Sequence, residues 1–338
     1  MIEILKVSVY AQLVDAGRRL ASHLGYTQSG ALDWQSFELG QALLGNHKAD
    51  AKFSHVGVEV TLGGIEMIFH QAALVALTGA PANCLVDGEA HNMNEAIFIP
   101  KGATLNVTNI GATQGARLYL ACRGLFDVPT LYGSASNVRR EGSGGLHLNG
   151  DSLQAGDTLS FKKQHSRPAH ELAELVETLR RDNKLIGSVL HRQSVIDTET
   201  LQFIPSYQWE SFSTKERLKL LSSEFMVSPD CDRMGMRLVG PSIDTDARTL
   251  YSQGLCNGAI QCAGNGQLIV MLNDRQTIGG YPVLGAVDGF SRAKLAQKKA
   301  GDPLRFTATD ELSIAAKRSI WHQQMKNLAT WVDQRLSS

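Results

Sequence analysis

No apolar run in the 338-residue sequence approaches the roughly 18 residues that a membrane-spanning helix needs. The first residues also lack the apolar core of a secretory signal, because Glu3 and Lys6 interrupt the Ile and Leu side chains there. Neither sign of charge is in excess, with 33 Lys+Arg and 33 Asp+Glu, so the long-range field of a nonspecific nucleic-acid or anionic-membrane binder is missing. We therefore expect a cytoplasmic protein that binds neither nucleic acid nor membrane.

Common catalytic and metal-binding motifs are also absent. The sequence has no G-x-x-x-x-G-K-[ST] phosphate loop, no G-x-S-x-G nucleophile elbow and no H-E-x-x-H zinc motif. Its five cysteines form no C-x-x-C pair, and its ten histidines lack i, i+4 or H-x-H spacing. We therefore expect neither a disulfide framework nor a metal site, and we interpret the cysteines as small buried apolar side chains.

Short apolar segments of strand length fill most of the first 160 residues. They are rich in β-branched and aromatic side chains and lie at 58–62, 96–99, 104–107, 118–120 and 158–161. Turn dipeptides such as Asp87-Gly88 and Lys101-Gly102 separate them. The exception is 36–44, where apolar residues recur at helical spacing before a glycine. This half is predicted to be a β lobe with one short helix.

The pattern becomes charged and helical between residues 163 and 190. We predict an N-terminal β lobe at 1–162, a helical linker at 163–190 and a C-terminal β lobe at 191–338. The last segment ends in a helix with Asp310 as its N-cap. An apolar stripe, expected to pack on the second lobe, runs along that helix through Leu312, Ala316, Ile320, Met325, Leu328 and Val332.

One segment pairs two arginines around a glycine. In a strand, alternation would place Arg233, Gly235 and Arg237 on one face and the intervening apolar residues on the other. Guanidiniums supply paired donors and glycine leaves room, so this face suits a carboxylate or a phosphate. Structural pairing of the arginines with carboxylates such as Asp232 or Asp246 is the alternative.

A second segment, 258–282, is crowded with side-chain amides. Gln261, Asn265 and Gln276 each offer a donor and an acceptor, which suits a ureido, lactam or carbamate group, although polar turns between strands would look similar. The N-terminal residues Asp15, Arg18 and Asp33 form a third candidate. A buried Asp–Arg pair that fixes an irregular segment explains them equally well.

Together, these segments resemble the family of allophanate hydrolase subunit 2, which includes the C-type subunit of 5-oxoprolinase and the carboxyltransferase half of urea carboxylase. The resemblance runs collinearly from about residue 10 to residue 310. It rests on D-x-G-R at 15–18, S-G-A-x-D at 29–33, L-x-G-N at 43–46, and the segments 59–64, 77–80, 117–120, 127–134, 232–238 and 276–282. Departures from the family pattern are Val14, Gly150-Asp151, Ser206, Tyr207, Asn257, Cys262, Ala263 and Leu268. Three of these replace prolines that would fix the backbone of a loop.

The resemblance implies a mainly β fold of cyclophilin-like β-barrel architecture in two lobes. It also implies that the chain acts in a complex with a B-type partner, homologous to allophanate hydrolase subunit 1, and with an A-type partner. The reaction that the resemblance implies for such a complex is the ATP-dependent opening of 5-oxo-L-proline to L-glutamate. Biotin-dependent carboxylation of urea or a related amide, and a non-catalytic regulatory role beside a kinase-inhibitor-like subunit, are the alternatives. The chain has no Met-Lys-Met biotin hairpin, so another subunit would have to supply any biotin. ATP is expected to be used by the complex.

The substrate 5-oxoproline carries a carboxylate at one end and a lactam N–H and C=O at the other. We therefore predict catalytic roles for Arg233, Arg237, Gln276 and Tyr281, the last as a hydroxyl donor. The residues predicted to bind substrate are Gln261, Asn265, Gly235, Asp15, Arg18 and Asp33. No nucleophile–base pair is apparent in the sequence, so the chain is predicted to be inactive without its partner subunits.

Overall fold

The computed structural model describes residues 1–18, 21–46, 55–161, 170–174, 176, 177, 179, 199–245 and 251–337. The predicted linker at 163–190 lies mostly outside these residues, and its described part at 170–174 is helical. Most of the strand region expected from 188 onward also lies outside them. The domain boundaries at 162 and 190 therefore stay predictions.

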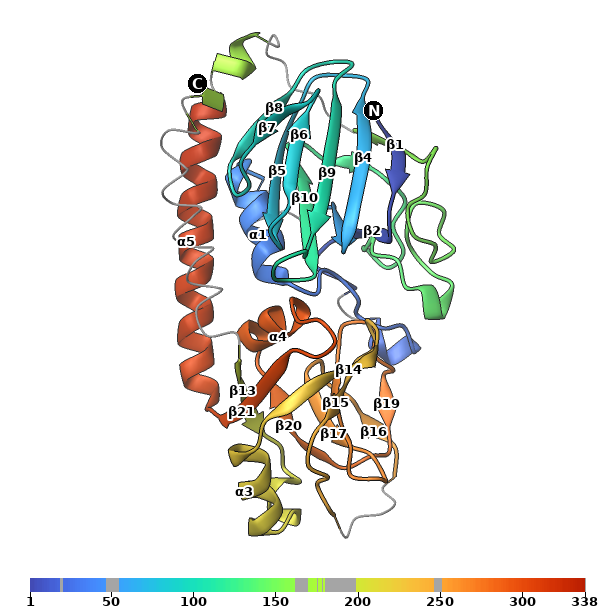
Figure 1. Cartoon of the computed structure of the whole chain (residues 1–338), viewed down its shortest axis with the longest axis vertical. Helices are drawn as coiled ribbons and strands as arrows, with labels where there is room; N and C mark the ends of the chain where they lie inside the picture. Colours follow the sequence, from blue (N-terminus) through green and yellow to red (C-terminus); the bar gives the residue numbers. More distant parts are fainter. Residues whose placement is uncertain are drawn as a thin grey trace.

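Two antiparallel sheets form the first lobe, shown in blue to green in Figure 1. One sheet has the order β11 (Phe126–Asp127), β12 (Thr158–Phe161), β1 (Ile2–Val7), β4 (Gly63–Phe69), β9 (Thr104–Ile110), β6 (Asn83–Val86), β7 (Glu89–His91). The other has the order β2 (Tyr10–Val14), β3 (Gly57–Thr61), β10 (Arg117–Cys122), β5 (Ala73–Gly79), β8 (Ala96–Ile99). Alternate side chains of both sheets, such as Ile4 and Val60, share one apolar core.

A closed seven-stranded barrel forms the second lobe. Its order is β13 (Thr200–Pro205), β20 (Val283–Val287), β17 (Ala259–Cys262), β18 (Leu268–Met271), β15 (Gly235–Val239), β14 (Phe225–Cys231), β21 (Pro303–Ala308). The smaller elements are η3 (Trp209–Ser211), α3 (Thr214–Ser222), α4 (Gly289–Ala296) and the ribbon of β16 (Gln253–Gly254) with β19 (Ile278–Gly279). The predicted mainly β fold, with a barrel and a C-terminal helix, is confirmed.

Helix α1 (Trp34–Leu43) matches the helical spacing seen at 36–44, and it lies along the flank of the first lobe next to β5, on the side of α5 (Figure 1). Asp33 caps it, because its Oδ1 accepts a hydrogen bond from the Ser36 N–H at 3.1 Å. The helix ends before Gly45, whose φ of +67° suits glycine. Before it lies η1 (Ser22–Leu24), and η2 (Arg139–Glu141) follows much later in the first lobe.

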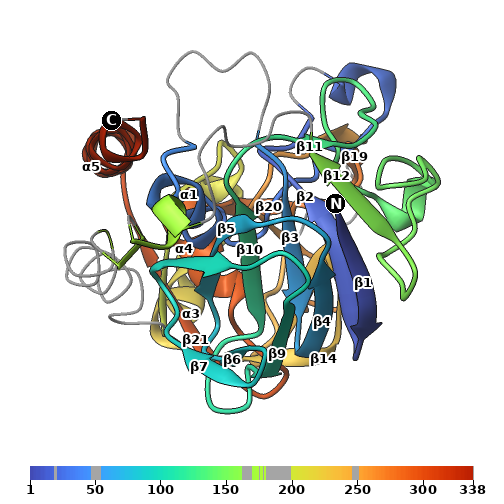
Figure 2. The same ribbon diagram turned by 90° about the horizontal axis from the view of Figure 1, so that it is seen from above.

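Helix α5 (Glu311–Ser337) extends along both lobes and stands beside α1 when viewed from above (Figures 1 and 2). Its buried residues Trp321, Met325 and Val332 pack with Leu39 and Leu43 of α1. The apolar face of this helix therefore packs mainly on the first lobe, where the sequence predicted the second. Its contacts with the second lobe include Phe290 of α4 and the hydrogen bond from Lys317 Nζ to Gln202 Oε1 at 2.6 Å.

The first part of the predicted stripe on α5 is also wrong. Leu312 is 83% exposed and Ile320 is 60% exposed, whereas Trp321 beside it is buried. The apolar partners of the stripe are α1 and neighbouring sheet residues such as Leu74 and Ala76, and α5 packs against them from Trp321 onward. The Asp310 cap forms as predicted, with the Ser313 N–H donating to Oδ1 at 2.9 Å.

Among the described residues, no helix combines the length and the apolar character needed to cross a membrane.

The interpretation of the cysteines as small buried apolar side chains holds for three residues: Cys84, Cys122 and Cys262 are buried. Cys231 is half-buried and Cys256 is exposed.

Candidate functional site

A cavity of about 540 Å³ on the barrel brings together five of the predicted site residues. We call it the barrel pocket. Gly235, Arg237, Gln261, Gln276 and Tyr281 line it, with Pro229, Asp230, Cys231, Asp232, Met234, Ile269 and Met271.

Strand register explains why Arg237 and Gln261 meet there. Arg237 on β15 and Gln261 on β17 are both paired with Ile269 of β18, which lies between them. Side chains at paired positions share one face of a sheet. The flanking residues Ile260 and Val270 belong to the barrel core, so the Arg237–Ile269–Gln261 row lies on the opposite face of the wall.

Two amides converge at one side of the barrel pocket. A Cβ on Gly279 would lie 3.0 Å from Nε2 of Gln261 and 3.3 Å from Nε2 of Gln276, so both reach the same backbone position. Gln261 is only 1% exposed, and its Nε2 has no hydrogen-bond partner among the described residues. Leaving a buried donor unpaired costs about 1–3 kcal/mol, so the pocket wall favours a ligand that brings an acceptor.

Arg237 supplies the cation of this pocket. Its side chain is exposed and makes no hydrogen bond or ion pair within the part of the chain that the structure describes. Of the nearby acids, Asp232 is engaged by its own loop, because its Oδ1 accepts from the N–H groups of Met234 at 2.7 Å and Gly235 at 3.1 Å. Burial raises the pKa of the Cys231 thiol, so this cysteine is not a thiolate nucleophile at neutral pH.

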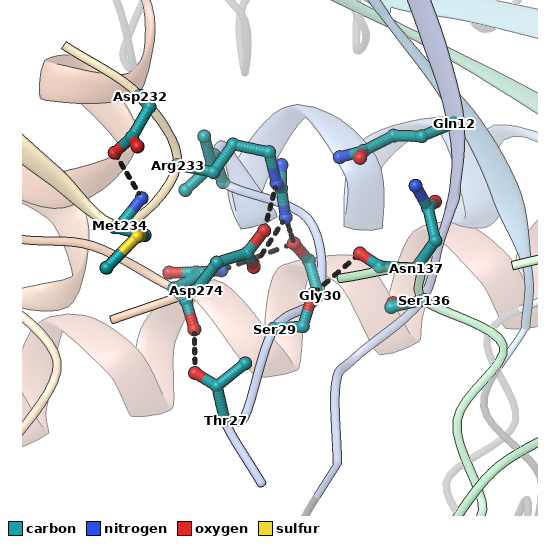
Figure 3. Close-up of polar contacts among 12 residues, drawn as sticks. Gln12, Thr27, Ser29, Gly30, Ser136, Asn137, Asp232, Arg233, Met234 and Asp274 are labelled. Carbon is teal, nitrogen blue, oxygen red and sulfur yellow. Dashed lines mark hydrogen bonds and ion pairs between the residues drawn. The ribbon is translucent and has the colours of Figure 1, made fainter. Parts of the chain in front are cut away.

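Arg233 lies elsewhere, at the junction of the lobes (Figure 3). It precedes β15, and its guanidinium points away from the barrel pocket. Arg233 therefore pairs with carboxylates, as the structural alternative predicted, but with other carboxylates than the Asp232 or Asp246 named there. Nε lies 2.8 Å from Asp274 Oδ2, Nη1 lies 2.5 Å from Glu59 Oε1, and Nη2 donates to the Gly30 carbonyl at 2.6 Å. The expected face with two arginines around Gly235 is therefore not formed.

Glu59 of β3 is the fully buried partner in this network. It accepts hydrogen bonds from Tyr119 Oη at 2.8 Å, from Gln12 Nε2 at 3.1 Å and from the Leu32 N–H at 3.1 Å. Burial alone would raise the pKa of Glu59, but Arg233 and then Arg117 outweigh it and lower the pKa. For Arg233, burial alone would lower the pKa, but Asp274 and Glu59 raise it. Both groups therefore stay charged at neutral pH.

The lowered pKa of Glu59 predicts a specific loss of stability in acid. The carboxylate's contribution is fully present above its unfolded pKa of about 4.3 and is lost as pH falls through the lower folded value. Urea unfolding of the wild type and of Glu59→Gln from pH 7 to pH 3 measures this. We expect the wild type to lose more stability than the variant below about pH 4.3, and parallel pH dependences would contradict the assignment.

Asp15 is buried within the first lobe and fixes the segment around Ser136. Its carboxylate accepts from the N–H groups of Gly17 at 2.8 Å and Ala135 at 2.7 Å, and from the hydroxyls of Ser134 and Ser136, both at 2.7 Å. Arg18, 1% exposed, donates from Nη2 to the Ser136 carbonyl at 2.6 Å. The expected Asp–Arg ion pair is not formed, since both residues instead hold the same backbone segment.

The other two predicted residues have local structural contacts. Asp33 caps α1 and also accepts from Gln297 Nε2 at 2.7 Å, which ties the lobes together. Asn265 is exposed in the turn between β17 and β18, where its Oδ1 accepts from the Gln267 N–H at 3.1 Å. Neither residue lines the barrel pocket.

Two motif glycines let the N-terminal segments approach closely. Gly17 has a φ of +82°, and a Cβ there would lie 2.7 Å from the carbonyl oxygens of Gln28 and Ser29. Gly30 has a φ of +97°, and a Cβ there would lie 2.9 Å from the Gly17 nitrogen. The D-x-G-R and S-G-A-x-D segments therefore pack backbone against backbone, which only glycine allows.

Glu59 and Asp274 were not singled out from the sequence as site residues. The only local signal is a charged residue in the apolar strand Val58-Glu59-Val60, which marks a buried carboxylate that needs a partner. Nothing local indicates that Arg233, far along the chain, is that partner. No cluster of three or more His, Cys, Asp or Glu side chains able to hold a metal ion is found among the described residues.

Comparison with known proteins agrees with this architecture. A family model described as "Carboxyltransferase domain, subdomain A and B" matches residues 24–308. The chain belongs to this carboxyltransferase-domain family. It is 31% identical to the C-type subunit of 5-oxoprolinase from Escherichia coli, over 90% of both chains.

Members of the family also occur as parts of longer proteins. The chain is 28% identical to the urea amidolyase of Saccharomyces cerevisiae over 89% of its own length, but it covers only 16% of that protein. The crystal structure of the Kluyveromyces lactis urea amidolyase has the same fold, with a TM-score of 0.81 at 22% identity, over 97% of this chain and 20% of that one. The relatives are thus a subunit of one enzyme and a domain of another.

Proposed function

We propose that the chain is a subunit of an ATP-dependent 5-oxoprolinase complex that opens 5-oxo-L-proline to L-glutamate, and that the barrel pocket receives the lactam. The observation that carries the proposal is the buried Gln261 amide, whose Nε2 lacks an acceptor among the described residues in the same pocket as the unpaired Arg237 guanidinium. The likeness to the C-type 5-oxoprolinase subunit supports it.

Each pocket residue then has a chemical task. Arg237 pairs with the substrate carboxylate. The amides of Gln261 and Gln276 donate to the lactam carbonyl oxygen and polarise it, so that water adds to the carbonyl carbon and forms the new C–O bond as the C–N bond breaks. Tyr281, which is 47% exposed at the rim, offers its hydroxyl to the ring nitrogen, which takes up a proton and leaves as the amine.

ATP does not fit the barrel pocket. A triphosphate needs several cations or a phosphate loop, but this pocket holds one unpaired arginine beside Asp230 and Asp232. We therefore place ATP outside the barrel pocket and assign its use to the complex formed with the A-type and B-type partners. The chain alone then lacks turnover.

Truncating Arg237 or Gln276 tests the assignment. In the complex reconstituted with the A-type and B-type partners, Arg237→Ala and Gln276→Ala are each expected to weaken 5-oxoproline binding about ten- to a hundredfold, because each removes one polar partner of the substrate. The measurement is kcat and KM for ATP-dependent release of L-glutamate. Arg305→Ala, on an exposed arginine of β21 that pairs with Glu224, is the matched control.

Two outcomes would contradict the proposal. One is full turnover and unchanged KM in both variants when their melting temperatures match the wild type, and the other is activity of the isolated chain with ATP and 5-oxoproline.

Carboxylation of urea or a related amide is the alternative function, supported by the likeness to urea amidolyase. Urea has no carboxylate, so a urea reaction insensitive to Arg237→Ala would favour that alternative.

A further inference from the structure

A second cavity, of about 500 Å³, lies between the two lobes. We call it the inter-lobe pocket. Its walls come from four parts of the chain: Asp15 with Ala16, the segment from Gln28 to Glu38, the second-lobe residues that include Asn257, Asn273 and Arg292, and Ile314 with Arg318 of α5. None of the residues lining the barrel pocket lines this one.

Arg292 of α4 is an unpaired cation in this wall. Its guanidinium makes no hydrogen bond or ion pair among the described residues, and its Nε is buried. Burial, followed by repulsion from Arg275, lowers the pKa of Arg292 to about 10, so the group is still charged at neutral pH. Arg275 is itself 8% exposed with Nη1 unpartnered within the described chain. The local positive charge thus has no matching anion in direct contact.

None of the nearby carboxylates forms an ion pair with Arg292 among the described residues. Asp288 attracts Arg292 and caps α4, with Oδ1 accepting from the Phe290 N–H at 2.7 Å, while its Oδ2 is buried without a hydrogen-bond partner in the described chain. Asp15 already accepts four hydrogen bonds within the first lobe. Glu38 accepts from Trp321 Nε1 at 2.8 Å. These acids leave the cationic wall open to an external anion.

Asn257 adds an acceptor to the same pocket. Asn273 Nδ2 donates to the Ala31 carbonyl at 2.9 Å, which fixes its amide so that Oδ1 accepts from Asn257 Nδ2 at 2.7 Å. Asn257 Oδ1 is then buried without a partner among the described residues. An acceptor left in this way favours a ligand that brings an N–H or O–H group.

We propose that the inter-lobe pocket binds a small metabolite that carries an oxyanion, either a carboxylate or a phosphate, next to an N–H or O–H donor. Arg292 holds the oxyanion, Asn257 Oδ1 accepts from the donor, and Arg318 contributes positive charge from α5. The pocket is separate from the barrel pocket, and the proposal does not depend on the activity assigned there.

Isothermal titration calorimetry on the full chain tests this with two probes, L-glutamate for the carboxylate and inorganic phosphate for the phosphate. We expect at least one probe to bind, and Arg292→Gln to weaken that binding about ten- to a hundredfold, because a charge-assisted pair is lost. Arg305→Gln is the matched control and should leave the affinity unchanged. Binding of L-glutamate in the barrel pocket would depend on Arg237, so titrations of Arg292→Gln in the Arg237→Gln background measure the inter-lobe pocket alone.

The two probes show which oxyanion the pocket recognises. If only L-glutamate binding depends on Arg292, the group is a carboxylate; if only phosphate binding does, it is a phosphate. If Arg292→Gln fails to fold, Arg318→Gln tests the proposal instead. Arg318 is exposed, so its substitution should weaken binding severalfold and leave the fold unchanged. The proposal is overturned if neither probe binds the wild type at millimolar concentration. Binding that folded Arg292→Gln and Arg318→Gln both leave unchanged would also overturn it.

Discussion

Replacing Arg233 by methionine is expected to lower the free energy of unfolding by about 3–5 kcal/mol. The change keeps the apolar stem but leaves the Glu59 carboxylate, which is fully buried, without its closest cation. Removing one partner of a buried ion pair costs this much because the other charge stays desolvated and uncompensated. Urea denaturation at pH 7 measures the change through the midpoint at constant m value.

Two comparisons isolate the cause. Arg305→Met removes an arginine from an exposed pair with Glu224, so it should change stability by less than about 1 kcal/mol. The double variant Arg233→Met with Glu59→Gln should recover part of the loss, since the Glu59 charge is then gone while Asp274 still lacks its arginine. If Arg233→Met loses less than about 1 kcal/mol, the junction of the lobes does not rest on this network.

Asp15→Ala is expected to destabilise the chain by about 3–5 kcal/mol. The variant removes an acceptor of four hydrogen bonds, two from backbone N–H groups and two from serine hydroxyls. Each buried donor without an acceptor costs about 1–3 kcal/mol, less where a hydroxyl can turn to another partner. Thermal unfolding followed by circular dichroism gives the loss.

Asp151→Ala is the matched control, because Asp151 is exposed and bonds only to its neighbour Asn149 among the described residues. A surface change of this kind stays within about 0.5 kcal/mol. Equal effects of the two substitutions would show that Asp15 does not organise the segment 134–136.

Local chemistry predicted the individual elements well. The helix at 36–44 and its glycine stop, the Asp310 cap, and the strand at 158–161 all follow from spacing, capping and side-chain type over a few residues. Alternation along 232–238 predicted that Arg237 and Gly235 share one face, and both line the pocket that also holds Gln261 of the amide-rich segment. Such features need only near neighbours in sequence, so a single sequence carries them.

Long-range placement was beyond the same reasoning. Alternation put Arg233 on the face of Arg237, but its guanidinium reaches Glu59, which is contributed by the other lobe. The stripe on α5 was assigned to the nearest domain in sequence, whereas its partners Leu39 and Leu43 lie almost at the other end of the chain. The inter-lobe pocket shares this property, since Trp34, Asn257 and Arg318 meet only in the folded molecule.

The packing of α5 onto α1 also constrains how the protein is made. A ribosome delivers the first lobe long before it delivers Trp321 and Met325, so the apolar face of Leu39 and Leu43 stays open to water during most of synthesis. Exposed apolar surface of this kind attracts chaperones and promotes aggregation. The N-terminal lobe therefore completes its surface only after translation has passed the barrel, and premature termination before residue 321 would leave a nascent chain with that face uncovered.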